Sequence, residues 1–230
     1  IRNPLGSIRG SIELLRTGGG LDDEDTRLCT IIEREVGRLD DLVTDMVDLS
    51  RPRRAEKDET DIAQVAKNVV ELDERSGRAP ELTLSYQGPD ELYATTDAAQ
   101  LRQVLWNLVR NAIQASQAGG HVTVELERLD EGARLTVRDE GSGIPSSQRE
   151  RIFDAFFTTR SHGVGIGLAV VKQVCETLGF ELTLETETGE GTTFTIHIPE
   201  GELRRRGSGT KLASSVLATG GESSSSAWPS

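Results

Sequence analysis

The 230-residue chain contains no apolar run that approaches the roughly 20 residues needed to cross a bilayer. Its first residues also lack the basic, apolar and small-residue order of a signal peptide. Positive charge is in deficit, because 26 Lys and Arg stand against 38 Asp and Glu and the net charge is −12. A field of this sign repels nucleic acids and anionic lipid surfaces. We therefore expect a cytoplasmic chain with no nucleic-acid partner and no direct membrane contact. A membrane anchor upstream in a parent protein stays open.

Cysteine is scarce, and the chain has only Cys29 and Cys175. Each lies in an apolar helical pattern without a potential metal ligand at close spacing. Free cysteine favours buried positions, so we expect two reduced, structural thiols. With 35% hydrophobic and 28% charged residues, the chain can form one medium globular domain with a smaller attachment.

Residues 1–52 carry apolar side chains at helical spacing. In the first half these are Ile1, Leu5, Ile8, Ile12 and Leu15, and in the second half Leu28, Ile32, Leu39, Leu42, Met46 and Leu49. Gly18-Gly19-Gly20 separates the halves and Pro52 ends the pattern, so we expect a hairpin of two helices at 1–52. Two copies of such a hairpin would form a four-helix bundle and make the chain a homodimer. Packing of the hairpin on its own neighbouring domain is the alternative.

The remaining chain is expected to contain a hinge at 53–60, a domain at 61–199 and a tail at 200–230. Helical patterns in the domain cover 61–76, 97–117 and 165–178, and strand patterns cover 81–87, 91–96, 120–129, 132–139, 180–187 and 192–198. Alternation such as Val122, Val124 and Leu126 indicates a sheet with one buried face. The predicted fold class is α+β, with the hairpin followed by a two-layer α/β sandwich. The tail is rich in Gly and Ser and is predicted to be disordered.

Five motifs in the domain indicate a nucleotide site. They are Asn107-Leu-Val-Arg-Asn111, Asp139-Glu-Gly-Ser-Gly143, Phe153-Asp-Ala-Phe-Phe157, Gly163-Val-Gly-Ile-Gly-Leu168 and Gly189-Glu-Gly-Thr-Thr-Phe194. Asn107 and Asn111 share one helix face inside an apolar stretch, where an unpaired amide would cost roughly 1–3 kcal/mol. The glycines from Gly163 open a helix whose N-terminal amides can receive phosphates. A dinucleotide site is disfavoured because no preceding βαβ unit is evident.

Taken in this order, the motifs resemble the catalytic, ATP-binding domain of bacterial sensor histidine kinases. That domain belongs to a superfamily shared with DNA gyrase, the Hsp90 chaperone and MutL. The resemblance implies that ATP and Mg²⁺ are the cofactors and that the γ-phosphate passes to a His in the dimerisation helix. It further implies a phosphorelay to an Asp of a response-regulator receiver domain, as in two-component signal transduction. Asn111-Ala-Ile-Gln-Ala115 is similar to a nitrogen-regulation-like subgroup of these kinases.

The start of the chain, Ile1-Arg-Asn-Pro-Leu5, resembles the residues that directly follow the phosphoacceptor His and its acidic neighbour in that family. None of His121, His162 and His197 lies in a matching context. We therefore expect a kinase core cut just after its phosphorylation site. Such a chain would bind ATP but would be unable to phosphorylate itself.

The resemblance also assigns catalytic roles. It implies that Asn111 holds the metal, that Asn107 binds phosphate or water, and that Arg110 neutralises developing phosphoryl charge. In the first helix, Asn3 matches a residue that positions water for dephosphorylating the response regulator. Asn3, Asn107 and Arg110 are thus the expected catalytic residues.

Asp139 is expected to accept a hydrogen bond from the adenine amino group, with Thr192 assisting through a water. Because guanine carries a carbonyl at that position, this arrangement would select ATP over GTP. The expected nucleotide-binding residues are Asn107, Asn111, Asp139, Gly141, Gly143, Ile144, Thr159, Arg160, Gly163, Val164, Gly165, Ile166, Gly167, Leu168 and Thr192.

A short lid is expected at 148–162, between the glycine motifs. Phe153, Phe156 and Phe157 are expected to anchor its hinge by apolar packing rather than to stack on adenine. Arg160 could reach the γ-phosphate, and a role as a surface charge is the open alternative.

Two other functions are weighed against the kinase. A hydrolytic ATPase of the gyrase or MutL type carries a Glu at the position of Asn107 to polarise water, and an Asn amide cannot act as a general base. An ATP-independent dimeric adaptor with a vestigial site would fold but show no Mg²⁺-dependent affinity for ATP. The intact glycine motifs disfavour that alternative.

Overall fold

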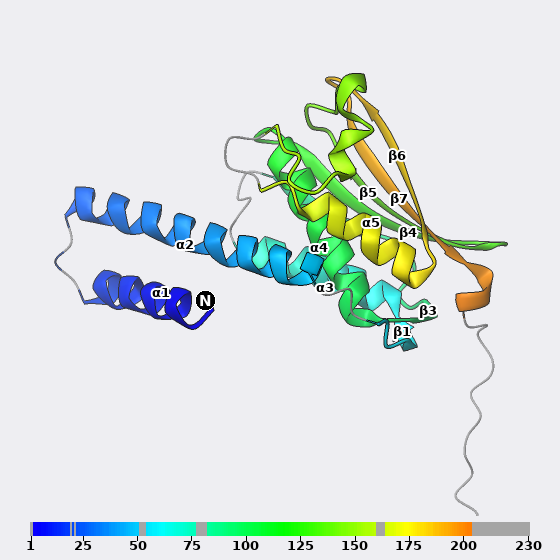
Figure 1. The fold of residues 1–230 in the computed structure, drawn as a ribbon, viewed down its shortest axis with the longest axis horizontal. Coiled ribbons are helices and arrows are strands. Elements are labelled where there is room, and N and C mark those ends of the chain that lie inside the picture. The colour runs from blue at the N-terminus through cyan, green and yellow to red at the C-terminus, as the bar shows by residue number, and fades with distance from the viewer. Residues whose placement is uncertain are drawn as a thin grey trace, which may run out of the picture.

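The structure is a computed structural model that describes residues 2–18, 20, 22–50, 54–76, 82–159 and 164–203. Its N-terminal part is an antiparallel pair of helices, α1 (Arg2–Thr17) and α2 (Asp23–Ser50), and α2 extends to contact α5 (Gly167–Leu178) of the domain that follows (Figure 1). The end of α1 is closed by Gly18 N–H, which donates to Leu14 O at 2.9 Å. At the start of α2, Asp22 Oδ1 accepts from Asp25 N–H at 2.8 Å, which caps the helix. The predicted helical hairpin is confirmed.

Among its described side chains, the hairpin buries little of its predicted apolar seam within one chain. Ile12, Cys29 and Val36 are buried. Other apolar side chains of the hairpin are largely exposed, namely Ile8, Leu14, Leu15, Leu28, Ile31, Ile32 and Leu39. The exposed set lies on both helices, so the single chain leaves an apolar surface uncovered.

Five strands form a mixed sheet in the order β2-β4-β5-β7-β6. The strands are β2 (Thr83–Gln87), β4 (His121–Leu129), β5 (Gly132–Asp139), β6 (Glu181–Glu187) and β7 (Gly191–Pro199). The β2–β4 pair is parallel and the other pairs are antiparallel. Helices α3 (Ile62–Ser76), α4 (Ala98–Ala115) and α5 cover one face of this sheet (Figure 1), which confirms the two-layer α/β sandwich.

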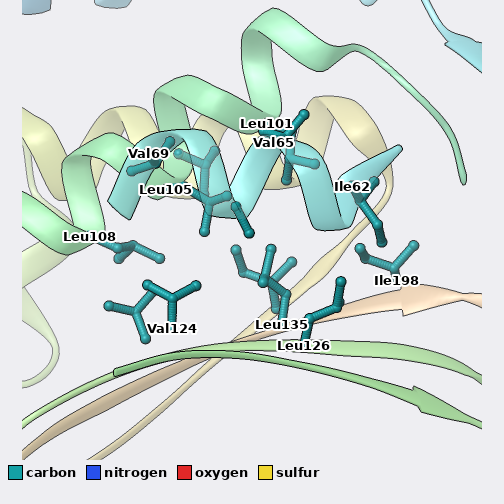
Figure 2. Packing of buried hydrophobic residues seen from close by; sticks show 14 of the residues in the cluster. Ile62, Val65, Val69, Leu101, Leu105, Leu108, Val124, Leu126, Leu135 and Ile198 are labelled. Carbon is teal, nitrogen blue, oxygen red and sulfur yellow. The ribbon is translucent and has the colours of Figure 1, made fainter. Parts of the chain in front are cut away.

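The core lies between these two layers. Val124, Leu126 and Leu135 point from the sheet toward Leu105 and Leu108 of α4 (Figure 2). Burial of each such side chain contributes about 1.5–3 kcal/mol. Helix α4 begins where the Asp97 carboxylate accepts from the backbone of the first helical turn, which fixes the register of the helix that carries the asparagines.

Part of the predicted hinge is a strand. Residues 58–60 belong to β1 (Asp58–Asp61), which pairs antiparallel with β3 (Tyr93–Thr96) in a separate two-stranded sheet. The hinge prediction is therefore wrong for these residues. The strand is polar and carries no apolar alternation, so its order comes from the backbone ladder to β3 rather than from a pattern in its own sequence.

The first residues of the predicted disordered tail are also ordered. A short 3₁₀ helix at Glu200–Glu202 leads to Leu203, which is buried and bridges to Ala94. Lys57 ties this end of the domain together, because its Nζ donates to Glu202 Oε1 at 2.7 Å and to Leu178 O at 2.9 Å. The prediction is thus corrected for residues 200–203, and residues 204–230 lie outside the described part.

Both cysteines are free and buried, as predicted. Burial raises the pKa of the Cys175 thiol to about 12, with a smaller contribution from the Glu176 carboxylate. The described residues contain no group of three or more His, Cys, Asp and Glu that could hold a metal ion. They also contain no helix long and apolar enough to span a bilayer.

Candidate nucleotide-binding site

Asn107 lies against the start of α5. Its side chain is 3% exposed, and its Nδ2 donates to Gln103 O one turn earlier at 3.1 Å. Its Oδ1 is buried without a hydrogen-bond partner among the described residues. A Cβ placed on Gly167 would lie 2.9 Å from this oxygen and 3.6 Å from Arg110 Nη2. The asparagine motif and the glycine motif, 60 positions apart, therefore meet at the N-terminus of α5.

An amide oxygen that is buried without a donor costs about 1–3 kcal/mol. Such a cost is expected where a side chain is held for a ligand, a water or a metal rather than for the fold. Asn111 is half-buried one turn further along the same helix. Its side chain offers an amide oxygen, the kind of hard ligand that Mg²⁺ prefers while it keeps waters and substrate phosphates around it.

The glycine loop before α5 is shaped for close backbone approach. Gly165 has φ +71°, and a Cβ on it would overlap the Phe157 carbonyl. The Gly165 carbonyl accepts from Phe156 N–H at 2.8 Å, which ties the loop to the end of the lid. Ile166 is buried below the loop and precedes the first turn of α5, whose amides can receive a phosphate. Val164 and Leu168 are half-buried in this segment, and Gly163 lies outside the described residues.

A 3₁₀ helix at Ser146–Gln148 leads into the lid, and a second one at Arg151–Phe153 lies within its described part. Phe153 packs edge-on against Phe194 of β7 with ring centroids 6.4 Å apart. Phe157 is half-buried beneath the Arg151 guanidinium, which lies 4.3 Å from the ring centroid. Phe153 anchors the lid to the core, as predicted. Phe157 contacts a side chain of the lid itself, so its apolar anchoring stays a prediction.

Phe156 does not anchor the lid. Its side chain is 62% exposed, and its φ of +69° lies in the left-handed region that non-glycine residues rarely adopt. Such backbone strain costs about 1–3 kcal/mol. The prediction for Phe156 is therefore wrong, because its backbone turns to meet Gly165 and directs the ring away from the core. Thr159 is exposed, and Arg160 lies outside the described residues.

Asp139 ends β5 at the opposite side of the site. Its side chain is buried, and its Oδ1 accepts from Gly141 N–H at 2.9 Å. A Cβ on Gly141 would lie 2.5 Å from Ala115 O at the end of α4. Gly143 has φ +63°, and a Cβ on it would overlap the Glu187 carbonyl. Both glycines therefore let the turn after Asp139 pass between α4 and β6.

A group of hydroxyls lies beside Asp139. Thr192 is buried and is the cross-strand partner of Asp139 in the β5–β7 ladder. Its Oγ1 lies 3.1 Å from Thr186 Oγ1 on β6. Thr186 Oγ1 in turn accepts from Ile144 N–H at 2.9 Å. The predicted residues Asp139, Ile144 and Thr192 are thus brought together.

Sequence reasoning missed Thr186, Arg149 and Gly191. Arg149 lies in the lid, and its Nη2 donates to Thr186 O at 2.7 Å. Gly191 has φ +99°, and a Cβ on it would overlap the Asp139 carbonyl. Gly191 could have been found from its place in the last glycine motif. Thr186 and Arg149 carry no such signal, because their roles depend on contacts across the sheet edge.

Two family models match the chain. Residues 96–202 match the "Histidine kinase-, DNA gyrase B-, and HSP90-like ATPase" family, and residues 1–55 match the "His Kinase A (phospho-acceptor) domain". The mycobacterial sensor histidine kinase MprB has a solved structure that is 30% identical in sequence, with a TM-score of 0.56. The match covers 97% of that structure's chain and 62% of this one. The chain belongs to the sensor histidine kinases.

Other sensor histidine kinases match both parts of the chain. ZraS of Escherichia coli K12 is 31% identical over 206 residues, which cover 89% of this chain and 44% of the length of ZraS. The present chain thus spans less than half of that relative. The structure of the histidine kinase ThkA in complex with the response regulator TrrA has a TM-score of 0.64 at 28% identity. That match covers 86% of this chain and 58% of the matched chain.

Neither of the two histidines in the described part of this sensor histidine kinase chain belongs to the hairpin. His121 and His197 lie on β4 and β7, and His162 is outside the described residues. Asn3 lies on α1, and its side chain is likewise outside the described part. The phosphoacceptor family match therefore rests on a hairpin sequence that contains no His.

Proposed function

We propose that this chain is the ATP-binding catalytic core of a sensor kinase. In the proposed reaction, the γ-phosphate of ATP moves to a His of the dimerisation helix and then to an Asp of a response regulator. The observation that carries the proposal is the buried Asn107 Oδ1, which lacks a hydrogen-bond partner among the described residues and lies against the first turn of α5. A fold without a ligand gains nothing from this arrangement, whereas a phosphate, water or metal there would use it.

The described residues offer suitable groups for both the adenine end and the phosphate end of ATP. At one end, Asp139 can accept a hydrogen bond from the adenine amino group, and Thr192 lies next to it. At the other end, the α5 amides and Arg110 supply positive electrostatic potential for phosphate. Asn111 would hold Mg²⁺, which when bound would neutralise phosphate charge and orient the γ-phosphate, and Asn107 would bind phosphate or water.

Asn107 favours transfer to an external nucleophile over hydrolysis. A water-attacking ATPase needs a general base next to the γ-phosphate, and an amide cannot take a proton from water. The acceptor would therefore be the imidazole of a His on the dimerisation helix.

For the partners, we propose a homodimer through the hairpin and a response-regulator receiver domain as phosphate acceptor. The exposed apolar side chains of α1 and α2 support the dimer, since a second hairpin would cover them. The ThkA complex with TrrA supports a response regulator, because a relative binds one. We further propose cytoplasmic action without nucleic-acid contact and a place near the nitrogen-regulation-like subgroup, which rests on residues 111–115. The proposed units are the dimerisation segment 1–52 and the catalytic domain 61–199, and the proposed tail begins only after the ordered residues 200–203.

We also propose that the 230-residue chain does not phosphorylate itself, since residues 1–52 contain no His. Placing His-Glu directly before Ile1 is expected to introduce labelling from [γ-³²P]ATP, and Asn3 would then lie four residues after the new His. Absence of labelling in a folded, ATP-binding chain extended in this way would contradict the proposed phosphotransfer.

Calorimetric titration with ATP, with and without Mg²⁺, tests the binding site. We expect Mg²⁺-dependent ATP binding that Asp139→Ala removes while the protein stays folded. Equal ATP affinity in the Asp139→Ala variant would contradict the adenine assignment. Absence of ATP binding by the folded chain would favour the adaptor function. Sustained phosphate release without a His acceptor would favour the hydrolytic ATPase.

A further inference from the structure

Thr186 Oγ1 has three hydrogen-bond neighbours beside the proposed adenine site. It accepts from Ile144 N–H at 2.9 Å, lies 2.9 Å from Gly191 O, and lies 3.1 Å from Thr192 Oγ1. A hydroxyl has one hydrogen and two lone pairs. The direction of each hydrogen bond can therefore be worked out by counting.

The amide of Ile144 can only donate, so it uses one lone pair of Thr186. The carbonyl of Gly191 can only accept, so it takes the single Thr186 hydrogen. One lone pair of Thr186 remains for Thr192, which must therefore donate its own hydrogen to Thr186. If Thr186 instead donated its hydrogen to Thr192, no hydrogen would remain between Thr186 Oγ1 and the Gly191 carbonyl oxygen. Two oxygens in contact without a hydrogen are unfavourable in a half-buried site.

With its hydrogen committed to Thr186, the Thr192 hydroxyl offers only lone pairs to any other group. Asp139, its cross-strand partner, also offers acceptors when ionised. The two side chains together thus present an acceptor surface to a base. Adenine brings an amino donor to such a surface, whereas guanine brings a carbonyl oxygen at the same ring position.

We propose that Thr186 is a specificity-determining residue that selects adenine by orienting the Thr192 hydroxyl. This inference rests on the proposed function, because it assumes that Asp139 and Thr192 meet the base. Thr186 itself acts through Thr192 and is a positioning residue. Its bond from Ile144 N–H and the bond from Arg149 to its carbonyl also hold the start of the lid on β6.

Calorimetric titrations of ATP and GTP against the wild-type chain, Thr186→Val and Thr186→Ser test the proposal. Valine keeps the shape but removes the acceptor, so the Thr192 hydrogen becomes free to face a guanine oxygen or a water. We expect ATP affinity to fall about three- to tenfold and the ATP-to-GTP preference to shrink by a similar factor. Serine keeps the hydroxyl and is expected to retain the wild-type preference.

The preference separates orientation from simple structural damage. Distortion of the site would weaken ATP and GTP alike, so a Thr186→Val variant with lower affinity but an unchanged preference would overturn the proposal. If this variant does not fold, Thr186→Ala is measured by the same criterion. Thr192→Val should reduce the preference by itself, and adding Thr186→Val to it should change the preference no further.

Failure of the proposed function would appear differently. In that case the folded wild-type chain would bind neither nucleotide, and Asp139→Ala would change nothing. Wild-type selectivity for ATP that is lost in Asp139→Ala but kept in Thr186→Val would leave the ATP site standing and overturn the role of Thr186.

Discussion

The hairpin and the α/β domain differ in how far they bury their apolar side chains within one chain. In the domain, Leu105 of α4 and Leu135 of β5 are fully buried within one chain. On the hairpin, Leu15 is 56% exposed and Ile32 and Leu39 are nearly as open. The domain therefore has a core of its own, whereas the hairpin leaves apolar surface exposed within one chain. The nucleotide site lies in the domain, and the proposed dimer interface lies on the hairpin.

The largest expected effect concerns the backbone of the domain. Gly143→Ala places a Cβ onto the Glu187 carbonyl at a positive φ, so we expect a loss of about 4 kcal/mol or more in unfolding free energy. Denaturant unfolding measures this loss. Gly189→Ala is the matched control, because Gly189 has φ +89° but no described atom within 4 Å of an added Cβ. It should cost about 1–2 kcal/mol, and equal losses in the two variants would contradict the close approach at Gly143.

A charged substitution on the hairpin tests whether its exposed apolar side chains form the dimer interface. Leu15→Glu is expected to raise the dimer dissociation constant about 100-fold or more, because it places two carboxylates in the covered surface. Leu72→Glu is the control, since Leu72 on α3 has the same exposed fraction of 56%. Sedimentation equilibrium measures both. Equal dimer dissociation constants for the two variants would show that the dimer interface does not include Leu15.

Asn107 is expected to matter for ATP affinity and little for the stability of the domain. Asn107→Ala removes a buried oxygen that lacks a hydrogen-bond partner among the described residues, so we expect the unfolding free energy to change by less than about 1 kcal/mol. ATP affinity should nevertheless fall about tenfold or more. Calorimetric titration and denaturant unfolding measure the two effects. A large loss of stability with unchanged ATP affinity would make Asn107 a residue of the core.

The smallest expected effect lies at the edge of the domain. Lys57→Ala removes the ion pair with Glu202 and the bond to the Leu178 carbonyl. The pair is partly exposed, so the expected loss is about 0.5–1 kcal/mol and decreases in high salt. Thermal unfolding at two salt concentrations measures it. A loss comparable with that of Gly143→Ala would show that residues 200–203 matter far more to the domain than the ion pair indicates.

The sequence predicted those features that a local pattern records. The helix periodicity and the strand alternation from Val122 to Leu126 both depend on neighbours along the chain, so they could be read directly. The ordered strand at 58–60 could not, because its polar residues are held by β3. The exposure of Phe156 depends on a backbone bond to Gly165, which no periodicity records.

The same distinction applies to the site. The motifs predicted Asn107, Asp139 and the glycines of the phosphate loop because each motif is a short segment of sequence. Thr186 and Arg149 act through hydrogen bonds across the edge of β6, so their partners are known only from the fold. The burial of the Asn107 oxygen likewise depends on the packing of α5 beside α4, which no single motif records.

The measurement that tests the account most directly is calorimetric titration of ATP and Mg²⁺ against the Leu15→Glu chain and the wild-type chain. If the nucleotide site is complete within one chain, the monomeric variant should bind about one ATP per chain with an affinity within about twofold of the wild type. A loss of ATP binding in a folded, monomeric Leu15→Glu chain would contradict the account, because it would show that the site depends on the second copy.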